Sequence, residues 1–344
     1  MFEQFGGKVT SAEKEKLSQS PQWDGKKFIN QIPTGMDISL KEFPSLLYQN
    51  FKGRSARAPQ KDLGFIPFDR SKIVGKQPQF AWFGHSALFL QLEGLNLLID
   101  PMLGPDASPI GPLRTRRYSQ NTLSLIDALP EIDAIFLTHD HYDHLDYASI
   151  QLLKRKTNRY FVALGVKRHL ESWGIPSAQI QEFDWWDEGK IDQVKFTFTP
   201  SRHFSGRGLT DRAKSLWGGW IFQTQSHQIY WSGDGGFGPH FEEVGRRFGA
   251  SDWGFMECGQ YHTLWQQIHM LPEEAAQAAQ LSKIKQAIPV HWAGFTLALH
   301  HWTDPVERFL AESIKVRQEI LTPQIGAIIE IGTIHQEKWW REIN

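Results

Sequence analysis

Short apolar runs, separated by polar or glycine-containing segments, dominate the chain from residue 79 onward. The runs at 79–92 and 95–100 flank Glu93–Gly94, a pair typical of hairpin turns, and they predict two strands. The continuous apolar run at 133–138 predicts a buried strand. Further strand-like runs lie at 160–164, 195–199, 218–224, 227–233, 253–259, 287–292 and 326–332.

Four segments between these runs have the composition of helices. They lie at 147–156, 166–174, 272–285 and 304–315, and Pro272 occupies a favoured first-turn position. The strands form two groups, and helices follow each group. This order predicts an α/β fold, an αββα sandwich of two packed β-sheets with helices on the outer faces.

Residues 1–75 differ in texture from the rest of the chain and are polar at first. Ser39 and Glu42 have capping-box spacing and predict the start of a short helix, in which Pro44 limits the length. Its apolar face would be made by Leu40, Phe43, Leu46, Leu47, Tyr48 and Phe51. We therefore predict an N-terminal arm, residues 1–75, packed on a main hydrolase domain, residues 76–344. The alternative is that the arm touches lipid or a partner subunit.

Composition and charge narrow the class of protein. Of 344 residues, 40% are hydrophobic and 22% are charged, which is ordinary for a soluble globular protein. The 37 Lys and Arg residues balance 38 Asp and Glu residues, so the net charge is −1. Nucleic-acid binding usually needs a basic surface, and we therefore expect no nucleic-acid partner.

The location of the protein is also constrained. The only cysteine, Cys258, cannot form an internal disulfide. The first 20 residues lack the basic start and apolar core of a secretory signal. No stretch approaches the roughly 18 apolar residues of a membrane-spanning helix. We expect a cytoplasmic protein, with peripheral membrane contact through the arm as an option, and the oligomeric state stays open.

The strongest chemical pattern follows the buried strand at 133–138. Residues 138–144 read Thr-His-Asp-His-Tyr-Asp-His, which places three histidines and the carboxylate of Asp143 at His-x-His-x-Asp-His spacing. His139 and His141 can point to one side, and Asp143 and His144 can face a second point nearby. Imidazole and carboxylate are ligands that suit zinc, and also iron or manganese. A chance cluster in a polar loop is the alternative.

Two adjacent metals need more ligands than these four residues supply. His203 follows the strand at 195–199, Asp234 follows the strand at 227–233, and His291 ends the strand at 287–292. Their shared position after short strands makes them candidates, although a lone histidine is usually a core or surface residue. The glycines beside Asp234 would let the backbone turn closely around a site.

These motifs resemble the metallo-β-lactamase fold. Within it, the segments at 80–103, 107–117, 232–241, 268–279 and 289–295 are similar to the N-acyl-phosphatidylethanolamine-hydrolysing phospholipase D branch. The Gly84-His85-Ser86 start and the Asp184-Trp185-Trp186 stretch also resemble the ascorbate-6-phosphate lactonases. The resemblance covers roughly residue 60 to the end of the sequence.

The resemblance implies a binuclear centre with two Zn²⁺ ions. One metal would be held by His139, His141 and His203, the other by Asp143, His144 and His291, with Asp234 bridging both. A hydroxide between the metals would attack the substrate, oriented by Asp143. His269 could contact a phosphate or the leaving group, and an ordinary loop histidine is the alternative. His85 and Asp100 would support the ligands rather than bind metal.

Two functions remain open from the sequence. The first is a phosphodiesterase of the phospholipase D type acting on a phospholipid, favoured by the branch motifs and the apolar arm. The second is a lactonase or another small-molecule ester or phosphoester hydrolase with the same metals. A nuclease is disfavoured by the near-zero net charge. A non-enzymatic metal-binding module is disfavoured by the seven candidate ligands.

Overall fold

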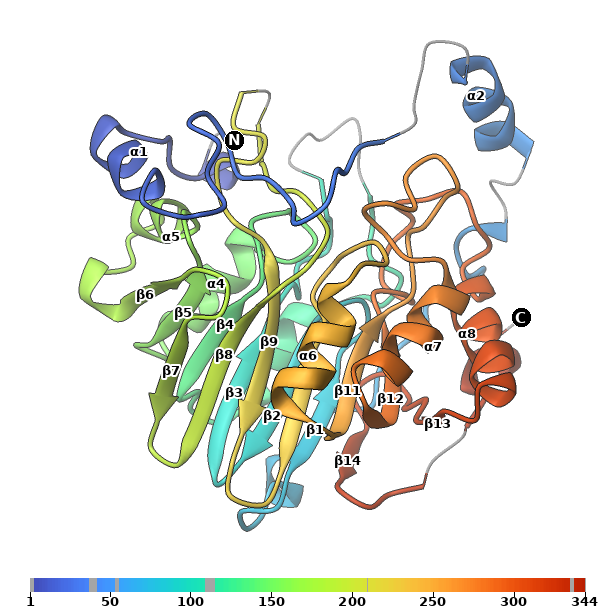
Figure 1. Ribbon diagram of the computed structural model, residues 1–344. Helices are drawn as coiled ribbons and strands as arrows, with labels where there is room; N and C mark the ends of the chain where they lie inside the picture. Colours follow the sequence, from blue (N-terminus) through green and yellow to red (C-terminus); the bar gives the residue numbers. More distant parts are fainter. Residues whose placement is uncertain are drawn as a thin grey trace.

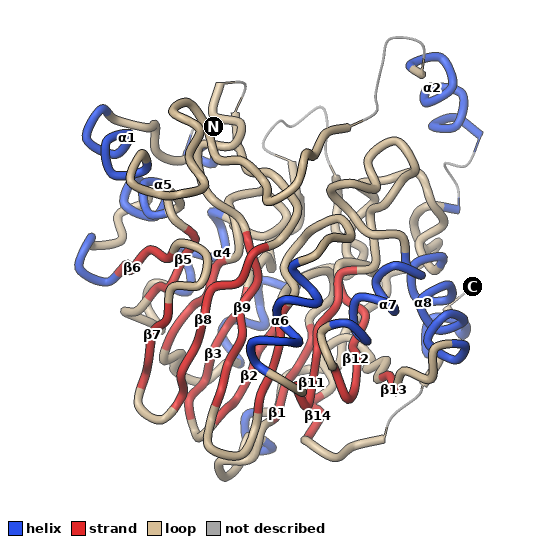
Figure 2. The backbone as a smooth tube through the Cα atoms, in the orientation of Figure 1, coloured by secondary structure: helices blue, strands red, loops and turns tan. Residues whose placement is uncertain are grey.

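The protein is an αββα sandwich, as the sequence predicts (Figure 1). The computed structural model describes residues 3–36, 42–52, 56–108, 115–208, 210–334 and 337–343. Two seven-stranded sheets pack against each other, with helices on their outer faces (Figure 2). Among the described residues, no helix has the length and apolar character needed to cross a membrane.

The first sheet has the strand order β14-β1-β2-β3-β4-β5-β6. Its strands are β1 (Gln79–Trp82), β2 (Leu88–Leu92), β3 (Leu95–Ile99), β4 (Ala134–Leu137), β5 (Tyr160–Ala163), β6 (Ile180–Phe183) and β14 (Ile328–Glu330). Neighbours from β14 to β3 are antiparallel, and those from β3 to β6 are parallel. Phe80 pairs with Leu90, which pairs with Leu97, so apolar residues align across the sheet.

The second sheet has the order β13-β12-β11-β10-β9-β8-β7. Its strands are β7 (Glu188–Ile191), β8 (Val194–Pro200), β9 (Gly218–Gln223), β10 (Gln228–Trp231), β11 (Ser251–Glu257), β12 (Ile284–Val290) and β13 (Glu319–Ile320). Neighbours from β7 to β10 are antiparallel, and those from β10 to β13 are parallel.

Helices cover both outer faces. Those on the second sheet are α6 (His240–Phe248), α7 (Pro272–Leu281) and α8 (Asp304–Lys315). The helices on the other side are α3 (Leu125–Ala128), α4 (Tyr147–Leu153) and α5 (Lys167–Ser172). Arg246 and Arg247 lie in the last turn of α6, where positive charge complements the helix dipole.

Aromatic side chains fill the space between the sheets. The Phe136 ring of β4 packs edge-on against Phe196, Trp220 and Phe222 of the second sheet, with centroids 4.8–5.1 Å apart. Phe80 of β1 makes the same kind of contact with Phe255, at 4.9 Å. Edge-to-face packing of this kind adds to the stability gained from burial of apolar area. The core thereby holds the ends of strands from both sheets in fixed relation.

Two sequence-based element predictions are wrong. The single strand predicted at 79–92 is two strands, β1 and β2, because His85 has a left-handed backbone (φ 55°) that turns the chain between them. The helix predicted at 272–285 ends at Leu281. Lys283 has φ 56°, which a helix cannot contain, and Ile284 then begins β12 and is buried in the sheet.

The N-terminal segment packs along one end of the sandwich. It contains α1 (Ser11–Leu17), a helix not predicted although Thr10 and Glu13 form a capping box. Trp173 Nε1 donates to Glu3 O at 2.6 Å, and the Phe28 amide donates to Ala213 O at 2.9 Å. The division of the chain at residue 75 stays a prediction.

Helix α2 (Phe43–Lys52) lies apart at the upper right of Figure 1. Pro44 occupies its first turn rather than its interior. The predicted start at Ser39 and the candidate residue Leu40 lie outside the described residues, as do the side chains of Phe43, Leu47 and Phe51. Leu46 is half-buried and Tyr48 is 64% exposed. Lipid or partner contact through this helix therefore stays a prediction.

Candidate metal centre

The predicted ligands gather at one end of the sandwich, where several strands finish. His139, His141, Asp143 and His144 follow β4, His203 follows β8, Asp234 follows β10, and His291 follows β12. These side chains form overlapping groups whose ligand atoms lie within 4.8 Å of one another. The structure thus brings all seven candidates together, and they form one candidate centre.

Three histidines make the first group, with their nitrogens directed at one point. His139 Nε2 lies 2.9 Å from His141 Nδ1, which lies 3.1 Å from His203 Nε2. His203 Nδ1 donates to Ile268 O at 2.8 Å, so its Nε2 carries the lone pair. The Thr138 hydroxyl donates to Asp100 at 2.7 Å and accepts from His139 Nδ1 at 2.9 Å. Because the Nδ1 atoms of His139 and His203 donate hydrogen bonds, the Nε2 atoms of these two rings keep lone pairs that face the centre of the group.

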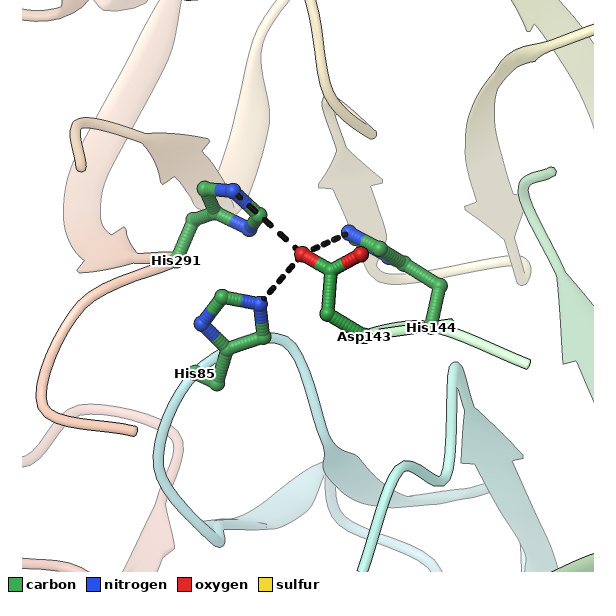
Figure 3. A group of neighbouring side chains, drawn as sticks. All are labelled: His85, Asp143, His144 and His291. Atoms are coloured by element: carbon green, nitrogen blue, oxygen red, sulfur yellow. Dashed lines mark hydrogen bonds and ion pairs between the residues drawn. The ribbon is translucent and has the colours of Figure 1, made fainter. Parts of the chain in front are cut away.

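The second group surrounds the Asp143 carboxylate (Figure 3). His85 Nε2 lies 2.9 Å from Asp143 Oδ2, His144 Nε2 lies 3.7 Å from it and His291 Nε2 lies 3.9 Å from it. Ser86 Oγ lies 2.9 Å from His291 Nδ1. Four potential ligand atoms thus converge from β4, β12 and the turn between β1 and β2.

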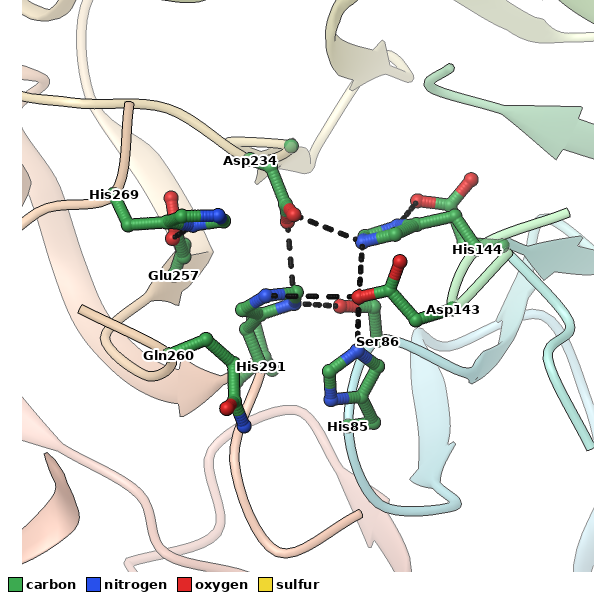
Figure 4. A network of polar contacts seen from close by, with 12 residues as sticks. His85, Ser86, Asp143, His144, Asp234, Glu257, Gln260, His269 and His291 are labelled. Atoms are coloured by element: carbon green, nitrogen blue, oxygen red, sulfur yellow. Dashed lines mark hydrogen bonds and ion pairs between the residues drawn. The ribbon is translucent and has the colours of Figure 1, made fainter. Parts of the chain in front are cut away.

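Asp234 lies between the two groups. Its Oδ2 is 3.0 Å from His144 Nε2 and 4.0 Å from His203 Nε2, while its Oδ1 is 3.2 Å from His291 Nδ1 (Figure 4). The preceding Gly233 has φ 64°, and a Cβ there would lie 2.1 Å from Gly218 O. Only glycine allows this close turn. The backbone thereby delivers the carboxylate to a position that faces both groups.

Burial sets the protonation state of most of these histidines. It holds the pKa values of His139, His203 and His291 well below the usual histidine value, and it lowers the pKa of His141 to about 4. These imidazoles are neutral at pH 7 and can offer lone pairs. His144 is the exception: burial opposes its charge, but the carboxylates of Asp234, Asp143 and Asp100 raise its pKa well above the usual value.

The donor set fits divalent metal ions. Three carboxylates that are buried or largely buried surround His144: those of Asp100, Asp143 and Asp234. Bound cations would compensate the negative charge of this cluster. His291 Nε2 is buried and makes no hydrogen bond to any described residue, which is the state expected of a nitrogen reserved for a metal. Neutral imidazoles with carboxylates are the donors that zinc uses. The chemistry of these residues therefore matches the metal site that the sequence predicts.

His269 lies beside the centre and shares a hydrogen bond with Glu257 (Figure 4). Its ring stacks on His291, with centroids 5.3 Å apart. Burial and the charge of Asp234 raise the pKa of Glu257 well above its usual value, and the Gly235 amide donates to Glu257 Oε2. The structure thus places His269 beside the candidate ligand His291, and its contact with substrate stays a prediction.

Glu257 and Ser86 are site residues that sequence reasoning missed. Glu257 is the last residue of β11. The criterion that identified His203 and Asp234, a position at the end of a strand, could have identified Glu257 too. Ser86 follows His85 in a motif already singled out, and nothing in the sequence shows that it meets His291. Asp100 and His85 lie next to the ligands, as the resemblance implies.

Comparison with known proteins agrees with this geometry. A β-lactamase superfamily domain matches residues 95–292. An uncharacterized protein of Mycobacterium tuberculosis is 33% identical over 329 residues, 94% of this chain and 88% of that protein. The N-acyl-phosphatidylethanolamine-hydrolyzing phospholipase D 1 of Caenorhabditis elegans is 29% identical over 270 residues, 72% of this chain and 74% of that protein.

A solved structure supports the fold assignment. Igni18, a metallo hydrolase from Ignicoccus hospitalis, aligns with a TM-score of 0.57 at 20% identity and covers 74% of this chain and 98% of its own. The domain match covers more than half of the chain and includes every predicted ligand. The chain therefore belongs to the β-lactamase superfamily and is a metal-dependent hydrolase with the metallo-β-lactamase fold.

Proposed function

We propose that this protein is a binuclear zinc hydrolase that cleaves the phosphodiester bond of an N-acylated phospholipid. The observation that carries the proposal is the position of Asp234 between the two groups, with one oxygen 3.0 Å from His144 and the other 3.2 Å from His291. A carboxylate in this place can serve two cations at once. Similarity to a phospholipase D of this type supports the choice of substrate.

The chain's own residues have distinct roles in this proposal. His139, His141 and His203 would hold one ion; Asp143, His144 and His291 would hold the other; Asp234 would bridge them. Two bound cations would lower the pKa of a water between them and stabilise negative charge on the phosphate. Asp143 is partly exposed and held by His85, so it can orient a water molecule. His269 reaches the same space and can donate to the leaving oxygen.

Metal analysis and a substrate panel test the proposal. Protein purified without chelator should contain about two zinc ions per chain, as measured by elemental mass spectrometry. The panel should include an N-acylated phosphatidylethanolamine in detergent micelles, a soluble aryl phosphodiester and a lactone. We expect the phospholipid to be hydrolysed fastest. Turnover of the lactone alone would instead support the lactonase function that the Asp184-Trp185-Trp186 resemblance favours.

A pair of variants makes the metal test specific. Asp234→Ala should lose most of both ions, because this carboxylate faces both groups. His227→Ala removes a half-buried histidine in the turn between β9 and β10, which pairs with Asp252 of β11 away from the centre, and should keep both ions. Well-folded wild-type protein without transition metal would refute the proposal.

A further inference from the structure

Arg212 is an exposed cation close to the candidate centre. Its guanidinium carbon lies 3.9 Å from the centroid of the Phe204 ring, a cation–π contact. In the part of the chain that the structure describes, no residue accepts a hydrogen bond from this side chain or forms an ion pair with it. A guanidinium has five N–H donors, and here they remain open to a ligand.

The nearest acidic residue in sequence does not neutralise this charge. Asp211 Oδ1 accepts the backbone amides of Gly208 at 2.7 Å and Arg207 at 3.2 Å. Its carboxylate is thus used within its own loop. The positive charge of Arg212 is left to interact with solvent or with a bound anion.

The backbone at Arg212 is well anchored. The Ala213 amide donates to Ser205 O at 2.8 Å, and Ala213 O accepts the Phe28 amide at 2.9 Å. Gly206 has φ 137°, and a Cβ there would come within 3.0 Å of the Arg212 Cα. The backbone segments at Gly206 and Arg212 therefore lie close together. The side chain therefore projects from a fixed position rather than from a free loop.

Phe204 connects Arg212 with the candidate metal ligands. The centroid of its ring lies 4.6 Å from that of His141 and 4.9 Å from that of His203. His141 and Phe204 are partly exposed and Arg212 is exposed. His141 of the first group, Phe204 and Arg212 are therefore in contact one after the other, and all three are at least partly exposed to solvent.

Arginine binds carboxylate and phosphate through paired N–H donors. We propose that Arg212 binds a second anionic group of the substrate, a carboxylate or a phosphate next to the group held at the centre. This assignment rests on the proposed function and deepens it, because it narrows the substrate to N-acylated phospholipids whose head group carries a second anionic group beside the phosphodiester, such as the carboxylate of an N-acylated phosphatidylserine.

Calorimetric binding to the metal-loaded protein tests the assignment without turnover. O-phosphoethanolamine carries one phosphate, O-phosphoserine adds a carboxylate, and 1,3-propanediol bisphosphate carries a second phosphate. We expect the wild-type protein to bind at least one of the last two about two- to fivefold more tightly than the first, as for a single exposed ion pair. The ligand that shows the preference identifies the anionic group.

Matched variants separate a specific contact from a general charge effect. Arg212→Gln should abolish the preference and leave phosphoethanolamine binding within about twofold, and Arg212→Lys should keep part of it. Lys214→Gln removes the same charge two residues away, where the ammonium donates to Lys26 O and lies 5.3 Å over Trp23; it should keep the preference.

Three results would overturn the assignment: no preference in the wild type, a preference that survives Arg212→Gln, or an equal loss in Lys214→Gln. An inactive wild-type protein that still shows the expected binding would count against the proposed function and not against Arg212. The two ideas therefore fail separately.

Discussion

His85 Nε2 donates to Asp143 Oδ2 at 2.9 Å from a fully buried ring. Burial lowers the pKa of His85 to about 4, so the ring is neutral at pH 7. The backbone around it is also bonded to the segment that carries the candidate ligand His291: the His85 amide donates to Trp292 O at 2.8 Å, and the His291 amide donates to His85 O at 2.9 Å. One residue between β1 and β2 thus fixes both Asp143 and the chain that carries His291.

We expect His85→Ala to weaken metal binding at the Asp143 group while the fold survives. Loss of a hydrogen bond that orients a ligand typically costs 10–100-fold in metal affinity. His85→Gln should restore part of the affinity, because its amide can place an N–H near the position of Nε2. Competition with a chromophoric chelator measures both variants. Unchanged affinity in His85→Ala would contradict this role.

The residues that gather at the candidate metal centre were easier to find from the sequence than the residues that support them. His139, His141 and His144 stand out because their spacing is informative by itself. A simple topological rule identifies His203, Asp234 and His291. Each follows or ends a strand, and strands of two packed sheets finish at the same end of the sandwich. His85 and Ser86, by contrast, act through contacts with residues far away in sequence, at separations of 58 and 205 positions.

Strand and helix boundaries fail where one residue overrides the apolar pattern. His85 breaks the run at 79–92, and Lys283 ends the helix before Ile284, each through a left-handed backbone that hydrophobic periodicity does not register. The buried strand β4 is predicted well because its apolar run is short and has polar ends, and β8 is predicted well because Phe and Thr alternate along it. Helix α6 was missed, although its apolar residues Phe241 and Val244 are buried at helical spacing.

The N-terminal segment also holds a candidate ligand in place. Asn30 Nδ2 donates to His203 O at 2.8 Å, and Asn30 Oδ1 accepts the His203 amide at 3.1 Å. Asn30→Ala should lower the free energy of unfolding by about 1–3 kcal/mol, because it leaves these backbone groups without partners. It should also reduce metal affinity through His203.

Urea unfolding and metal content measure both effects of Asn30→Ala. Gln31→Ala is the matched control, since the Gln31 side chain is exposed and its one hydrogen bond to a described residue is a long one, 3.4 Å to Glu243. Equal stability in the two variants would show that the paired hydrogen bonds of Asn30 contribute little.

His240 predicts a pH dependence of stability that is independent of the metals. Burial, with the nearby charge of Arg202, lowers its pKa to about 3. The unfolded state binds a proton near pH 6.5, so stability is full above that pH and falls as the pH drops toward 3. Between pH 7 and 5 this one group should cost about 2 kcal/mol.

The measurement compares urea unfolding of the wild type and His240→Gln at pH 7 and pH 5. The variant should lose less stability on acidification, because the other histidines contribute equally to both proteins. His301→Gln, which changes an exposed histidine, should follow the wild type. If His240→Gln loses as much unfolding free energy between pH 7 and pH 5 as the wild type does, His240 is not the source of the pH dependence.

Exposed apolar residues of the N-terminal segment predict how a bilayer substrate would be reached. Ile29 is 43% exposed and Met36 is 40% exposed, and they flank the hydrogen bonds that tie this segment to His203 and Gln267. Each buried methylene contributes roughly 0.8 kcal/mol, so two such side chains can support weak, reversible attachment to lipid. We expect Ile29→Ser with Met36→Ser to lower turnover of phospholipid in vesicles at least about threefold. Turnover of a soluble phosphodiester should stay unchanged, because neither residue belongs to the candidate centre.

The control for this pair is Ile314→Ser on α8, where the side chain is 72% exposed. Removal of that apolar group should leave vesicle turnover at the wild-type level, because attachment needs apolar surface beside the centre and not on any face of the molecule. Thermal melting confirms that all variants are folded. An equal loss on vesicles and on the soluble substrate would assign Ile29 and Met36 a structural role, since a defect in packing affects catalysis whatever carries the substrate.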